Sequence, residues 1–347
     1  MGNDTSRILI ETIVRKTLRE IKASPGRSTR NLIDMALNFS EGRFQRNFFE
    51  AAQTMLTNEK SPYYELIRDT VAHVDCERLL QFGMNVGYHG CTVGARKIRE
   101  IEEKEHYNIP WMLSLCLDSE TFCRNQKAYQ TIISEGESLG IHAWILVSKD
   151  CPQEALSLVR EHPESGFALM ITPDEASEEF LKEASEAYNL MLVIRCGEGA
   201  AEVCCKMREK ELLYGVCDFY TAETAKQITD GSFFAEAQKL HPAVTMAVAA
   251  SDCPEAVIEE VYGYVKSARD RQLFRTVVWE AGCDSILVDS IISQDACLAW
   301  FDAEGQLITQ AGRTKEACCN LLESSLQDIL RHTFPKKRQN LAAGQGG

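Results

Sequence analysis

Apolar residues recur at helical spacing through the first part of the chain. Those from Ile10 to Ile21 fall on one face of a helix expected over residues 6–23, and a Pro-Gly pair then breaks the pattern. The same periodicity predicts three further helices, with an aromatic-rich turn at residues 38–45 between the second and third. Residues 1–75 are therefore expected to form a helical module.

Beyond residue 75, short apolar runs alternate with helix-forming segments. The runs are rich in β-branched and aromatic residues and are flanked by Gly, Pro or Asp, which is typical of buried strands. We expect strands at residues 80–86, 111–117, 143–147, 168–171, 190–194, 213–217, 245–249 and 276–279. Helices are expected at residues 93–105, 126–139, 152–161, 177–187, 200–211 and 254–272.

Alternating strands and helices indicate a parallel sheet, because each helical crossover returns the chain to the same end. The expected fold class is α/β, and about eight such units over residues 76–281 favour a (β/α) barrel or partial barrel. A doubly wound open sheet is the alternative.

The last part of the chain has a different rhythm. Residues 286–288, 297–301 and 306–309 read as short strands, with a hairpin turn between the last two and a helix over residues 316–332. This predicts a hairpin-helix extension over 282–335. Residues 336–347, rich in Gly, Gln and Ala, are expected to be a disordered tail.

Composition narrows the function classes. The net charge is -14, and the acidic excess lies beyond residue 100, so nucleic acid is not an expected partner. No apolar run is long enough to span a bilayer, and no membrane association is expected. The 14 cysteines lack a framework spacing, and the chain does not open on a signal-peptide pattern. We therefore expect free thiols and a cytoplasmic protein.

Two segments carry a family resemblance. Residues 301–307 contain a D-x-x-G turn, and residues 320–330 follow with N-L-x-E-x-S-L-x-x-I. This order resembles the C-terminal SPASM or twitch extension of the radical SAM superfamily. The segment 82–90 occupies the place of that family's glycine-rich second strand end, so the resemblance loosely covers residues 76–332.

The resemblance implies a barrel that holds a [4Fe-4S] cluster and S-adenosylmethionine through a C-x-x-x-C-x-x-C loop. This chain contains no such loop. In the extension, Cys297 stands where a first auxiliary-cluster cysteine is expected, but Thr309 and Gln310 stand where the next is needed. The expectation is a degenerate relative, and no cofactor is assigned.

A glycine-rich segment follows the first expected strand of the barrel. If residues 87–97 form a loop between a strand and the start of a helix, the unpaired N–H groups of that helix would favour binding of a phosphate or carboxylate. The alternative is that the glycines only permit a tight turn and close packing. The predicted ligand-binding residues are Asn85, Gly87, Tyr88, Gly90, Thr92 and Arg96.

Polar residues end most of the expected strands, where a (β/α) barrel places its active site. They are Asn85, Asp118, Lys149, Thr172, Arg195, Asp218, Tyr220 and Glu280. Arg195 and Glu280 close apolar strands, where a charge must meet a cavity, water or a partner. With His89 they are the predicted catalytic residues; the alternative is that Arg195 and Glu280 form structural ion pairs.

Four groups of residues contain possible metal ligands, and no metal site is predicted. His89 and Cys91 could form a ligand pair, but a third ligand cannot be named. The pairs Cys204-Cys205 and Cys318-Cys319 lie in helical patterns, where adjacent side chains diverge by about 100 degrees. Asp284, Asp289 and Asp295 do not have the spacing of an EF-hand loop, and surface solvation accounts for them better.

Three hypotheses of function remain, and turnover is left open in the first. The first is a barrel that binds an anionic small molecule at the carboxyl ends of its strands, which requires His89, Arg195 and Glu280 to share one pocket. The second is a scaffold protein that binds a protein partner through residues 1–75; it requires an exposed patch formed by Phe39, Phe44, Phe48 and Phe49. The third is an iron-sulfur enzyme whose ligands are drawn from Cys91, Cys116, Cys196, Cys283 and Cys297.

Overall fold

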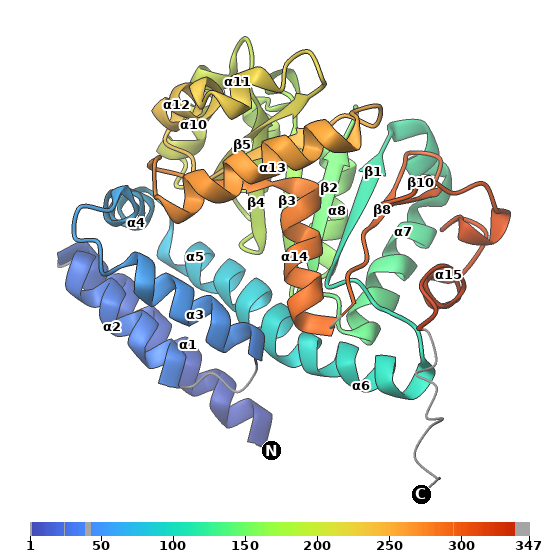
Figure 1. Ribbon diagram of the computed structural model, residues 1–347, viewed down its shortest axis with the longest axis horizontal. Helices are drawn as coiled ribbons and strands as arrows, with labels where there is room; N and C mark the ends of the chain where they lie inside the picture. The colour runs from blue at the N-terminus through green and yellow to red at the C-terminus, as the bar shows by residue number, and fades with distance from the viewer. Residues whose placement is uncertain (1, 24, 39–42, 294, 337–347) are drawn as a thin grey trace, which may run out of the picture.

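A curled ten-stranded sheet forms the centre of the molecule (Figure 1). The computed structural model describes residues 2–23, 25–38, 43–293 and 295–336. The strand order is β10-β9-β8-β1-β2-β3-β4-β5-β6-β7. The sheet does not close between β7 and β10, so the expected α/β fold is confirmed in its partial-barrel form.

Strands β1 to β7 follow one another in the sheet, and every neighbouring pair is parallel. Seven of the eight strands expected in the barrel are thereby confirmed. Their bounds are β1 Met112–Leu117, β2 Ala143–Ser148, β3 Gly166–Ile171, β4 Leu190–Arg195, β5 Tyr214–Tyr220, β6 Val244–Ala249 and β7 Val277–Glu280.

Helices cover the outer face of the sheet. Along β4, Leu192 and Ile194 point into the outer core with the helices, while Met191 and Val193 point to the concave face. Both faces are apolar, which is why these strands read as continuous hydrophobic runs. The connecting helices are α7 Ser119–Leu139, α8 Pro152–Glu161, α9 Glu178–Ala184, α10 Ala200–Glu209, α11 Lys226–Thr229, α12 Ser232–Ala237 and α13 Glu255–Asp270.

The expected N-terminal helices are present. They are α1 Gly2–Ala23, α2 Pro25–Asn38, α3 Arg43–Met55 and α4 Pro62–His73. Figure 1 shows α1, α2 and α3 side by side, next to the longer helical run that follows α4. The boundaries drawn between the helical module, barrel and extension stay predictions.

The strand predicted at residues 80–86 is wrong. Helix α5 (Cys76–Gly83), a π-helix (Met84–Gly94) and α6 (Ala95–Glu105) run through this region as consecutive helical elements. Asp75 caps the start, its Oδ1 accepting the Arg78 N–H at 2.9 Å. Apolar side chains lie on two sides of α5, because Leu80 packs toward α1 and Phe82 packs toward the sheet. The polar residues Glu77, Arg78 and Gln81 do recur at helical spacing, but only Gln81 of these lies inside the predicted strand.

The strand predicted at residues 286–288 is also wrong. Residues 286–288 lie within helix α14 (Ala281–Ser293), which packs on β6 and β7. Its Ala281 belongs to the concave-face cluster, whereas Val261 of α13 packs on the opposite side of those strands. Because Asp284 and Asp289 are buried together with its apolar residues, α14 has no distinct polar face, and its short apolar run reads like a buried strand.

The predicted hairpin is confirmed. Strands β8 (Ala299–Phe301) and β9 (Leu307–Thr309) are antiparallel, and β10 (Gly312–Arg313) pairs with β9. Asp302 Oδ1 accepts the N–H groups of Glu304 and Gln306 across the turn, at 3.1 and 2.8 Å. Gly305 has a φ of 80°, a left-handed conformation that favours glycine.

The helix predicted over 316–332 is shorter than expected. A 3₁₀ turn (Ala317–Cys319) comes first, and α15 spans only Leu326–Thr333. Asn320 stops the helix between them, because its side chain bonds Glu304 O at 2.9 Å and accepts the Leu322 N–H at 2.8 Å. Cys318 and Cys319 consequently lie on a tight turn and not in a helix, whereas Cys204 and Cys205 do lie in α10. The tail expected over 336–347 falls, apart from Lys336, outside the described residues.

Across the described ranges, no helix combines the length and the apolar composition that crossing a bilayer requires.

Candidate functional site

The carboxyl ends of β1 to β7 form one rim of the half-barrel, where this class of fold holds its functional groups. The apolar strand residues below the rim form the concave face: Ile145, Ala168, Met170, Met191, Val193, Cys217, Met246 and Val248. Val147, Phe219, Trp279 and Trp300 pack against this set and are only partly buried. The rim is therefore amphipathic, with aromatic rings beside polar strand ends.

Arg195 is an exposed charged group on this rim. It is the last residue of β4, and its side chain is 52% exposed. The guanidinium lies over the Phe219 ring, 5.2 Å from its centroid, and Nε is 3.8 Å from Asp218 Oδ1. Burial raises the pKa of Asp218, and Arg195 partly offsets that rise. Arg195 thus meets a neighbouring strand and not Glu280.

Glu280 is fully buried and acts as a helix cap. Its Oε2 accepts the Cys283 N–H at 2.6 Å, and its own N–H donates to Asp284 Oδ2 at 2.9 Å. The Tyr220 hydroxyl donates to Oε1 at 2.9 Å. Burial raises the pKa of Glu280, while the bonds from Cys283 and Tyr220 oppose the rise. These contacts account for the buried carboxylate without a substrate.

Among the other residues of the rim, Asp118 and Thr172 form caps, and Lys149 is a second exposed cation. Asp118 caps α7, its Oδ1 accepting the Thr121 N–H at 2.9 Å. Thr172 bonds Glu175 through both its N–H and its hydroxyl, at 2.7 and 3.0 Å. Lys149 is exposed just beyond β2, and its charge opposes the effect of burial, which raises the pKa of Cys116.

His89 lies at the opposite end of the sheet. It belongs to the π-helix, and its ring centroid is 5.6 Å from that of His142, which precedes β2. Burial lowers the pKa of His89. His89 and Asn85 border a cavity of about 90 Å³ between α1 and α5. The three predicted catalytic residues therefore do not share one pocket.

The cavity beside His89 is lined largely by polar groups that are already paired. Arg15 bonds Glu77 at 2.6 Å and Glu11 at 2.9 Å. Asn85 Nδ2 donates to the carbonyls of Pro163 and Ser165, both at 2.8 Å. Asn85 thus fastens the loop before β3 to the π-helix.

The predicted anion site before α6 is not formed as expected. Because the π-helix runs directly into α6, the Ala95 N–H donates to the Gly90 carbonyl within the helix and cannot face an anion. Gly94 is required for packing, since a Cβ there would lie 2.2 Å from the Gly140 carbonyl oxygen. Gly90 lies against Trp111, and Thr92 Oγ1 donates to the Gly87 carbonyl at 3.2 Å.

The remaining members of that predicted set lie on the same helical run. Gly87 is exposed, Tyr88 packs edge-on to His89 with ring centroids 5.6 Å apart, and Arg96 is exposed on α6. The glycines thus fit the packing alternative better than an anion-binding loop.

Two aspartates expected at the surface are buried. Asp284 forms a two-pronged ion pair with Arg269, at 2.7 and 2.8 Å. Asp289 accepts the N–H groups of Trp111 and Cys297, at 2.8 and 2.7 Å, and burial raises its pKa to about 7. Asp295 is exposed, as expected.

The cysteines proposed as iron-sulfur ligands are spread over the fold. They are Cys91, Cys116, Cys196, Cys283 and Cys297, all of them described. None belongs to a group of three metal-ligand side chains whose donor atoms lie within 4.8 Å of one another. The aromatic patch predicted for the helical module falls mainly outside the described side chains; Phe49 is partly buried.

Comparison with known proteins gives distant structural likeness only. No protein-family model and no curated protein matches the chain. Streptococcus suis SuiB bound to the precursor peptide SuiA shares 11% identity over 68% of this chain and 68% of that one, with a TM-score of 0.48. Another structure of SuiB shares 10% identity over 86% of this chain and 78% of that one, with the same TM-score. No family assignment follows.

A second enzyme has a lower TM-score than SuiB. The 3-dehydroquinate dehydratase of Geobacillus kaustophilus HTA426 shares 9% identity over 64% of this chain and 88% of that one, with a TM-score of 0.37. The resemblance to the radical SAM superfamily therefore stays a prediction.

Sequence reasoning missed the aromatic part of the rim. Phe219 and Trp279 alternate with residues that face the outer helices, so the period-two pattern of their strands already placed them on the concave side. The signal was obscured because both faces of these strands are apolar.

Proposed function

We propose that this protein binds a small molecule that carries an anionic group next to an apolar group, at the carboxyl rim of the half-barrel. Arg195 binds the anion, and the partly exposed aromatic rings of the rim, Phe219, Trp279 and Trp300, receive the apolar part. The observation that carries the proposal is the half-exposed Arg195 guanidinium stacked over Phe219.

The guanidinium geometry suits this role. Stacking on an aromatic ring fixes the plane of the group and leaves its N–H edge for a carboxylate, phosphate or sulfonate. Asp218 competes only weakly, because an exposed ion pair with 3.8 Å between its atoms contributes roughly 0–1 kcal/mol. Lys149 adds a second exposed cation to the rim of a chain with a net charge of -14.

The apolar half of the ligand has a matching surface. Phe219, Trp279 and Trp300 are large, partly exposed and packed on the apolar concave face. Removing apolar area from water favours a complex by about 25 cal/mol for each Å², before the cost of immobilising the ligand is subtracted. A ring or short alkyl chain on the ligand would thus add to the ionic contact.

The proposal concerns binding and not turnover. Glu280 is bonded as the cap of α14, and His89 lies at the other end of the strands. Neither is placed to exchange a proton with a group held by Arg195.

An apolar sulfonate, 8-anilinonaphthalene-1-sulfonate, tests the proposal by fluorescence titration. Arg195→Gln removes a charge-assisted hydrogen bond and should raise the dissociation constant roughly tenfold. Arg160→Gln is the matched control, because Arg160 is 40% exposed and paired with Glu183 and Glu186 on the outer helices. Equal dissociation constants for wild type and Arg195→Gln would refute the role of Arg195.

A further inference from the structure

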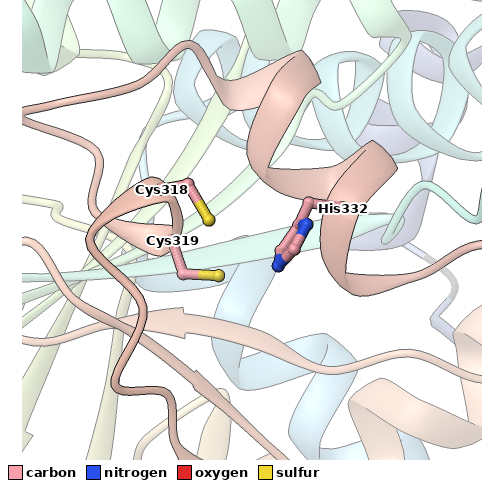
Figure 2. A group of neighbouring side chains, drawn as sticks. All are labelled: Cys318, Cys319 and His332. Carbon is pink, nitrogen blue, oxygen red and sulfur yellow. The ribbon is translucent and has the colours of Figure 1, made fainter.

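A second group of chemically reactive side chains lies in the extension. Cys318, Cys319 and His332 bring one donor atom each to within 4.8 Å of one another. Figure 2 shows both thiols and the imidazole directed into the same space between the 3₁₀ turn and α15. This group is separate from the concave face, because Cys319 belongs to the outer core.

The backbone on both sides of this space is held in place. Leu321 N–H donates to the Gly305 carbonyl at 2.8 Å, which ties the turn to the hairpin. Ser325 caps α15, and the following Leu326 N–H donates to Glu135 Oε2 at 2.6 Å. Cys319 is buried, and its Sγ is 3.6 Å from Thr333 Oγ1. These hydrogen bonds therefore fix the backbone on which the three side chains stand.

We propose that Cys318, Cys319 and His332 bind one Zn²⁺ ion. Two sulfurs and one imidazole nitrogen are ligands that Zn²⁺ prefers, and the absence of an oxygen donor in the group disfavours Mg²⁺ and Ca²⁺. Zn–S bonds of about 2.3 Å place tetrahedral sulfurs about 3.8 Å apart, so the thiols need to shift by only about 1 Å.

Three protein ligands leave the fourth position of a tetrahedral ion open. Cys318 and His332 are exposed, so this position faces solvent and would hold water or an incoming ligand. A bound Zn²⁺ takes both thiols as thiolates, so its binding releases protons.

Cobalt substitution of the full, reduced chain tests the site directly. One equivalent of Co²⁺ should produce thiolate-to-cobalt charge-transfer bands and the d–d bands of a tetrahedral site, and Zn²⁺ should displace both. Cys318→Ser and His332→Gln should each raise the dissociation constant for Zn²⁺, measured against a chromophoric chelator, by roughly a hundredfold. Both side chains are exposed, so these variants should fold.

Cys205→Ser is the matched control. Cys204 and Cys205 are also one buried and one exposed neighbour, but they lie in α10, where their side chains diverge. This variant should bind Co²⁺ and Zn²⁺ as the wild type does. Zn²⁺ should also raise the thermal midpoint of the wild type and of Cys205→Ser, and leave that of Cys318→Ser unchanged. Wild type without charge-transfer bands, or Cys318→Ser with unchanged affinity, overturns the site.

Discussion

At the amino ends of the strands, polar side chains are bonded into the structure, whereas at the carboxyl ends two cations stand exposed. Asn85 and Asp289 each satisfy two backbone groups of the amino edge. Arg195 and Lys149 lie at the other edge, one half-exposed and one exposed. A buried amide and a buried carboxylate thus stabilise the amino edge, whereas two cations remain available for ligands at the carboxyl edge.

The difference follows from what covers each edge. The run from α5 to α6 crosses the amino edge, so polar groups there lose water and must find protein partners. The carboxyl edge carries connecting loops, and it is the edge at which the functional groups of (β/α) folds gather. Substitutions at the amino edge should therefore lower the free energy of unfolding. Substitutions at the carboxyl edge should change the dissociation constant of a ligand.

The largest effect is expected for Asp289→Ala. The substitution leaves the buried N–H groups of Trp111 and Cys297 without an acceptor, and each unsatisfied group costs about 1–3 kcal/mol. The free energy of unfolding from urea denaturation should fall by roughly 3 kcal/mol. Asp295→Ala, at an exposed position, should change it by less than about 0.5 kcal/mol. Similar losses in both variants would contradict the account of the amino edge.

The same carboxyl predicts a dependence on pH. Burial raises the pKa of Asp289 to about 7 in the folded state, so the protonated form is favoured by folding. The stability it contributes is complete below the pKa of the unfolded chain and is lost as pH rises through the folded value. Between about pH 5 and about pH 8 the loss should be roughly 2 kcal/mol.

Asp289→Asn isolates that contribution. Asn does not titrate, so the pH profile of its unfolding free energy should be flatter than that of the wild type over the same range. Parallel profiles for the two proteins would show that Asp289 has no raised pKa.

A smaller effect is expected at the carboxyl edge for Phe219→Leu. The substitution keeps an apolar side chain but removes the ring under Arg195, a contact worth about 0.5–1 kcal/mol at an exposed site. The dissociation constant of the apolar sulfonate should rise about two- to fivefold, less than for Arg195→Gln. A larger rise for Phe219→Leu would mean that the ring itself is the main contact.

The smallest effect is expected on the stability of Arg195→Gln. Its ion pair with Asp218 is 3.8 Å long and half-exposed, so the free energy of unfolding should change by less than about 0.5 kcal/mol. A loss as large as that of Asp289→Ala would make Arg195 a structural residue and remove the contrast between the edges.

The sequence predicted most of the sheet because each strand is a short apolar run flanked by turn residues. It failed at residues 80–86, where most of the polar face of α5 lies before the predicted strand, and at 286–288, where α14 shows no polar stripe. Period alone does not separate a buried strand from a helix of this kind.

The site was predictable only in part. Arg195 was identified because a charge at the end of an apolar strand requires water or a partner. The prediction that His89 shares this edge is wrong, because its segment is a π-helix at the amino ends of the strands and not the end of a strand. The pattern predicts a helix through Cys318 and Cys319, because the sequence does not show that Asn320 and the hairpin break it.

The most direct test of the account compares two probes that share a ring system, the anionic 8-anilinonaphthalene-1-sulfonate and the neutral N-phenyl-1-naphthylamine. The ratio of their dissociation constants isolates the contribution of the negative charge. We expect Arg195→Gln to change this ratio roughly tenfold in favour of the neutral probe, while Arg160→Gln leaves it unchanged. An unchanged ratio in Arg195→Gln would contradict anion binding at the carboxyl edge.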